Sequence, residues 1–132
     1  MTSWEAFERV IAVIHEDSKR IRMGTILIDA DRLMWLPGPG FRETLPRCGT
    51  VGCIAGWLGV VTGRLGMQGA ISHVVVPEEL RMELSRAFYG GDHFFTVDGT
   101  PEQAKAVIEW IEGFMGRNSR VLQAFKIEVP GC

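Results

Sequence analysis

The stretch CGTVGCIAGW, residues 48–57, contains two cysteines, Cys48 and Cys53, with four residues between them. Thiolates can act as nucleophiles or bind zinc. Glycine and threonine at residues 49–50 are typical of a helix start, so a helix is predicted from Val51 to about Thr62. A helix N-terminus lowers the pKa of a nearby thiol. A cysteine-dependent hydrolase or transferase using Cys48 or Cys53 is therefore one hypothesis.

Such an enzyme needs a base beside its thiol. His73 or His93 could act as that base, and Asp92 could orient a histidine. Three histidines in 132 residues are close to what chance supplies, so these residue types are weak evidence for a site. Packing of Cys53 as a small buried apolar residue is favoured over reactivity. Binding is therefore favoured over catalysis.

A structural zinc module is a further alternative. Zinc needs four ligands, and His73, His93 and Cys132 could complete a set with the two cysteines of the decapeptide. The chain has no second close cysteine pair, and Cys53 is predicted to lie inside a buried helix. We therefore expect no metal and no cofactor.

The predicted helix start also suggests an anion site. Free backbone N–H groups of residues 49–52 (Gly49, Thr50, Val51 and Gly52), beside Arg47, could hold a phosphate or carboxylate. The alternative is that Thr50 only caps the helix and Arg47 meets a nearby carboxylate. No phosphate-binding P-loop motif is present. The candidate surface for a ligand or partner comprises Trp35, Arg47, Cys48, Gly49, Thr50, Asp92 and His93.

The elements that must position these residues are mostly helices. Apolar residues recur every three or four positions from Trp4 to Ile14 behind a Thr2 cap, and again over 80–88 and 104–115. Pro77 and Thr100-Pro101 mark helix starts. Residues 25–28 and 72–76 read as short extended segments, and 119–126 as a short helix or arm. The prediction is one mainly α domain over 1–132, with a small accessory β element or an α+β fold as the alternative.

Glycines give the helix after Cys48 a special character. Gly49, Gly52, Gly56, Gly59, Gly63 and Gly66 follow steps of three and four, which would place them on one helix face. The other faces carry bulky apolar residues such as Ile54 and Trp57. We therefore expect this helix to be the buried centre of about four helices.

Composition limits the class of protein. Hydrophobic residues make up 46% of the chain. The net charge is −2, so the chain lacks the basic excess of a general nucleic-acid binder. Lys19, Arg20 and Arg22 are bracketed by acidic residues and read as a solvated face. We expect no membrane span, because the longest uncharged stretch is too short, and no secretory signal, because the first residues lack a basic segment followed by an apolar run. A cytoplasmic protein is expected.

The motif C-G-T-V-G-C-I-A-G-W, with its Thr100-led helix and its Ala87-Phe88-Tyr89 helix end, resembles small uncharacterised actinobacterial and phage proteins. Their motif is similar to C-G-T-x-x-C-I-A-G-W, and Gly52 departs from it where alanine is expected. The resemblance covers about residues 20–115 and implies origin and architecture rather than mechanism. It implies a phage-encoded or mobile-element protein that binds or sequesters a host protein or small anionic ligand, with a role in anti-defence. Such a protein would work in the host cytoplasm, and a homo-oligomer is compatible with it.

Overall fold

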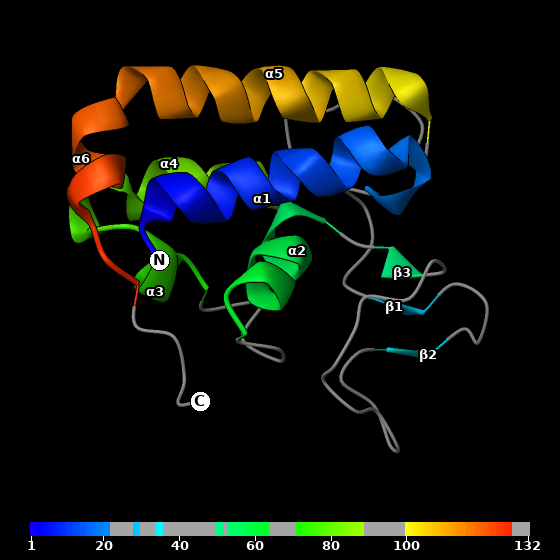
Figure 1. The fold of residues 1–132 in the computed structure, drawn as a ribbon, viewed down its shortest axis with the longest axis horizontal. Helices are drawn as coiled ribbons and strands as arrows, with labels where there is room; N and C mark the ends of the chain where they lie inside the picture. Colours follow the sequence, from blue (N-terminus) through cyan, green and yellow to red (C-terminus); the bar gives the residue numbers. More distant parts are fainter. Residues whose placement is uncertain are drawn as a thin grey trace.

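The computed structural model describes residues 1–21, 28–29, 34–35, 50–51, 53–63, 71–88 and 100–127. Within these ranges, helices dominate (Figure 1). The helices are α1 (Ser3–Glu16), the 3-10 helix η1 (Ser18–Arg20), α2 (Ile54–Val61), α3 (Ser72–Val75), α4 (Glu78–Phe88), α5 (Pro101–Arg117) and α6 (Ser119–Ala124). The predicted mainly α fold is confirmed. No helix in the described ranges is long and apolar enough to cross a membrane.

Helices α1 and α5 pack side by side and form one layer of the fold (Figure 1). The Thr2 side-chain oxygen accepts a hydrogen bond from the Glu5 amide at 3.2 Å, and Thr100 caps α5 in the same way through the Gln103 amide. Both predicted caps are therefore confirmed. The rings of Phe7 and Phe114 meet with centroids 5.4 Å apart, which joins the two helices through the core.

Helix α2 packs against α1 and lies below the α1–α5 layer in the view of Figure 1, as predicted for a buried central helix. Every residue from Ile54 to Gly59 is buried. The predicted start was wrong, because α2 begins at Ile54 with Cys53 at its N-cap. Gly63 has a φ of 72°, and its amide donates a hydrogen bond to the Val60 carbonyl. Gly63 therefore terminates α2 and is not part of a glycine face on that helix. Of the expected glycine stripe, only Gly56 and Gly59 lie within α2.

The segment after residue 70 also differs from its predicted conformation. Residues Ser72–Val75 form the helix α3, although their β-branched valines suggested an extended segment. The buried Ser3 hydroxyl donates to the Val75 carbonyl, which ties α3 to the start of α1. Tertiary contact therefore overrides local preference at this point. Helix α4 follows as predicted behind Pro77, and α6 confirms the helical alternative for 119–126.

Three two-residue strands form the accessory β element. They are β1 (Ile28–Asp29), β2 (Met34–Trp35) and β3 (Thr50–Val51), in the order β2-β1-β3 with both pairings antiparallel. Ile28 pairs with Trp35 on one side and with Val51 on the other. Strand β3 lies against η1, and this contact joins the sheet to the helical layer.

Candidate functional site

The residues that sequence reasoning selected are only partly described. Arg47, Cys48, Gly49, Asp92 and His93 lie outside the described residues, as does Cys132. Trp35 and Thr50 lie in β2 and β3, the two outer strands of the sheet. The role of Thr50 as a helix cap is corrected, because Thr50 pairs with Asp29 in a strand and α2 starts four residues later. The helix N-terminus therefore does not form where the anion site was predicted.

Cys53 is a buried, reduced cysteine at the N-cap of α2. Its side chain is 6% exposed. Burial raises the pKa of the thiol above its ordinary value, and this effect exceeds the opposite influence of the backbone amides of Gly56 and Ala55. The expected lowering of the pKa by a helix N-terminus is therefore wrong for Cys53. Its environment favours the protonated, packed thiol over a nucleophile.

His73 lies in α3 and is exposed to solvent. Among the residues that the structure describes, no three histidine, cysteine, aspartate or glutamate side chains gather closely enough to hold a metal ion. His73 and Cys53 are the two members of the proposed zinc set that fall within this part of the chain. The described residues thus provide no metal centre.

Lys19 is exposed, as expected for the solvated face predicted at Lys19, Arg20 and Arg22, and Arg22 lies outside the described residues. The expectation is wrong for Arg20. This arginine is 7% exposed, and its guanidinium lies 4.7 Å from the centre of the Trp57 ring. Trp57 is fully buried, and its indole Nε1 donates to the Arg20 carbonyl at 2.8 Å. Glu16 approaches the same guanidinium at 3.9 Å. The arginine is therefore a structural link between η1 and α2.

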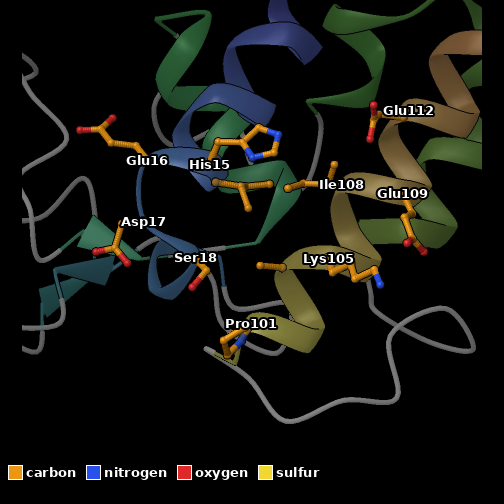
Figure 2. A pocket seen from close by; sticks show the side chains of 11 residues that line it. His15, Glu16, Asp17, Ser18, Pro101, Lys105, Ile108, Glu109 and Glu112 are labelled. Atoms are coloured by element: carbon orange, nitrogen blue, oxygen red, sulfur yellow. The ribbon is translucent and has the colours of Figure 1, made fainter.

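The strongest candidate site in the described structure is a groove along α1 and α5. It contains two hollows, of about 650 Å³ and about 320 Å³, and both are lined by Glu112. The larger hollow lies between the end of α1 and the start of α5, and Figure 2 shows the side chains that line it. The smaller hollow lies between Trp4 and Ile11 of α1 and Met115 and Gly116 of α5. We call the two together the α1–α5 groove.

The residues that line the two hollows follow one stripe along each helix. On α1, the lining residues Trp4, Glu8, Ile11 and His15 follow steps of four, three and four, which is one stripe of a helix. On α5, the lining residues Pro101, Lys105, Ile108, Glu112 and Gly116 follow steps of three and four. Each stripe lies beside the core-facing stripe of its own helix. Because α1 and α5 run antiparallel, the two stripes line the same groove from end to end.

The groove has an apolar floor. Ile14, Ala104 and Met115 are buried beneath it, while Trp4, Ile11 and Ile108 are half-buried and keep part of their surface in the groove. A cavity of several hundred Å³ with apolar walls and a few polar groups is the usual form of a binding pocket. The groove therefore has the size and lining of a ligand or partner site.

Carboxylates surround this floor. Five of them line the two hollows, Glu8, Glu16, Asp17, Glu109 and Glu112, against a single lysine, Lys105. Figure 2 shows Glu16 and Asp17 on the α1 side, Glu109 and Glu112 on the α5 side, and His15 and Ser18 between them. Within the described part of the chain, Glu8, Glu109 and Glu112 form no ion pair or side-chain hydrogen bond. Their charge is therefore available to a ligand.

Sequence reasoning missed this groove because it assigned Trp4, Ile11 and Ile108 to the core stripes. The signal was present in the width of those stripes. Trp4 and Ile11 lie at the edge of the apolar stripe that contains the fully buried Phe7 and Val10. The carboxylate of Glu8 lies farther around the helix on the same side. An apolar arc that is wider than one neighbouring element can cover is typical of a second packing surface.

Among the described residues, η1 links the predicted surface to the groove. Strand β3, which contains Thr50, lies against η1, and Ser18 at the start of η1 lines the larger hollow.

Comparison with protein-family models, with curated proteins and with solved structures finds no match to this chain. The resemblance to phage-type proteins therefore stays a prediction.

Proposed function

We propose that this protein is a binding and regulatory protein, rather than an enzyme, and that it holds a partner protein in the α1–α5 groove. The observation that carries the proposal is the groove itself, with two neighbouring hollows, half-buried apolar side chains, and the carboxylates of Glu8, Glu109 and Glu112, which form no ion pair within the described part of the chain. Cys53, the one described candidate nucleophile, is buried and has a raised pKa, which does not favour the hydrolase alternative.

The charge of the groove favours a protein partner over the small anionic ligand that the sequence also suggested. Five carboxylates repel an anion, and the helix start predicted to hold one is formed elsewhere. The resemblance to phage-type proteins makes a host protein, such as a component of antiviral defence, the expected class of partner. The protein would act by occupying a surface that its partner needs.

Position-specific crosslinking tests this proposal. A photoreactive amino acid is placed at Lys105, which is exposed and lines the larger hollow, or at Met82, which is 67% exposed on α4 outside the groove. Both proteins are irradiated in a lysate of the cell in which the protein is made. We expect a covalent adduct of defined mass from position 105 and none from position 82. The same adducts from both positions, or none from position 105, would refute the groove as the binding surface.

A further inference from the structure

We infer that the occupant of the α1–α5 groove is a basic amphipathic helix of a partner protein, about four turns long. This inference rests on the proposed function and adds the chemistry of the partner. The length of the groove indicates the length of its occupant. From Pro101 to Gly116 the lining of α5 extends over sixteen residues, and the fifteen steps between them span about 22 Å at the helical rise of 1.5 Å per residue. One segment of about sixteen helical residues would fill both hollows.

The walls of the groove favour a helical occupant. Both walls are helices, and their backbone amides and carbonyls are already bonded within α1 and α5. An extended peptide would place its own N–H and C=O groups on an apolar floor that offers few partners, which is costly. A helix satisfies those groups internally, and its side-chain ridges fit between the stripes of two neighbouring helices. Apolar residues at intervals of three, four and seven would then reach Ile108 in the larger hollow and Trp4 in the smaller one.

The charges of the groove favour a basic occupant. Glu8, Glu109 and Glu112 lie along the groove and form no ion pair with the residues that the structure describes, and Lys105 is the one lysine among the described lining residues. The half-buried Trp4 ring adds a surface on which a lysine or arginine can form a cation–π contact. A second copy of this chain, placing its own acidic groove against the first, would be repelled. The groove therefore complements a helix with an apolar stripe flanked by lysine and arginine.

The test uses two synthetic helices of sixteen residues with the same leucine pattern. One carries lysine and arginine beside the leucines, and the other carries glutamate at the same positions. Binding of each fluorescently labelled peptide to the full chain is measured by anisotropy at low and at high salt. We expect the basic peptide to bind at least about tenfold more tightly than the acidic one, and its affinity to fall as salt screens the carboxylates.

Variants place the binding in the groove. Glu109→Gln with Glu112→Gln removes two exposed charges, and we expect between about two- and thirtyfold weaker binding of the basic peptide. Gly116→Leu fills the smaller hollow, because a Cβ at Gly116 meets nothing within 4 Å. We expect that variant to weaken binding at least about tenfold. The matched control is Glu78→Gln with Glu79→Gln, the same charge change on exposed positions of α4, which should leave binding unchanged.

The outcomes separate this inference from the proposed function. Equal binding of the two peptides, or full binding by both groove variants, would overturn the basic helix. If crosslinking at Lys105 captures a partner through an acidic or extended segment, the proposed function stands and this inference fails. If the basic peptide binds as expected but Lys105 captures nothing from the lysate, the chemistry of the groove stands and the proposed function fails.

Discussion

Trp57 is the residue whose replacement tests the packing of the fold most directly. It is fully buried in α2, its Nε1 donates to the Arg20 carbonyl at 2.8 Å, and its ring lies 4.7 Å from the Arg20 guanidinium. Trp57→Phe keeps an aromatic ring but removes the N–H group and the second ring. The substitution should therefore affect the hydrogen bond, the cation–π contact and the packing at the same time.

The magnitude follows from these three losses. A buried carbonyl left without its donor costs about 1–3 kcal/mol. Removing the second ring leaves a cavity that costs about 1–2 kcal/mol, and the weaker cation–π contact adds about 0.5–1 kcal/mol. We expect Trp57→Phe to lower the free energy of unfolding by about 3–5 kcal/mol, a large share of the usual 5–15 kcal/mol. The Tm should fall by roughly 11–18 °C.

Urea denaturation followed by circular dichroism at 222 nm measures this change without relying on tryptophan fluorescence. The matched control is Trp4→Phe, the same substitution at a half-buried position, which should cost about 1 kcal/mol or less. A double-mutant cycle with Arg20→Met keeps the Arg20 backbone carbonyl and isolates the contact between the Arg20 guanidinium and the Trp57 ring, for which we expect a coupling energy of about 0.5–2 kcal/mol. Losses within 1 kcal/mol of each other for the two tryptophans would refute the role assigned to Trp57.

Three further predictions concern Cys53, Thr2 and Gly116. Because burial raises the pKa of Cys53 in the folded state above its ordinary value of 9.0, the unfolded chain loses this proton first as pH rises, so stability should decline above about pH 9. Cys53→Ala should remove that part of the decline in urea titrations at pH 7 to 10; an unchanged slope would contradict it. Thr2→Ala should cost about 1 kcal/mol through loss of the cap on the Glu5 amide, and Thr2→Ser should restore most of it in thermal unfolding. Gly116→Ala should stabilise the protein by up to about 1 kcal/mol, because the added methyl group meets nothing within 4 Å; a lower Tm would count against an open groove at that end.

The helices could be predicted from sequence where local signals and tertiary packing agree. Thr2 and Thr100 cap their helices as their side chains suggest, and the buried stripes of α1 and α5 follow the expected period. The start of α2 was misplaced because Thr50 has the chemistry of a cap, whereas its pairing with Asp29 across β3 and β1 requires an extended backbone. That pairing joins residues far apart in the sequence, and no local pattern reveals it.

The site was harder to predict than the fold. Cysteines, histidines and tryptophans attract attention because they can do chemistry, yet Cys53 and Trp57 are buried and structural. The groove consists of common residues, such as Glu109 and Ile108, whose importance comes only from lying opposite another helix. A helical projection shows which residues share a face, but it does not show whether a neighbour covers that face.

The described residues of the decapeptide at 48–57 stabilise the groove without lining it. Its Thr50–Val51 segment forms β3 against η1, and its Trp57 side chain holds the Arg20 carbonyl at the end of η1. Asp17 and Ser18, immediately before and at the start of η1, line the larger hollow. Two contacts from one short stretch of chain thus hold the turn that forms one wall of the groove. Substitutions at Trp57 should therefore weaken partner binding as well as stability, whereas Glu109→Gln and Glu112→Gln should weaken binding alone.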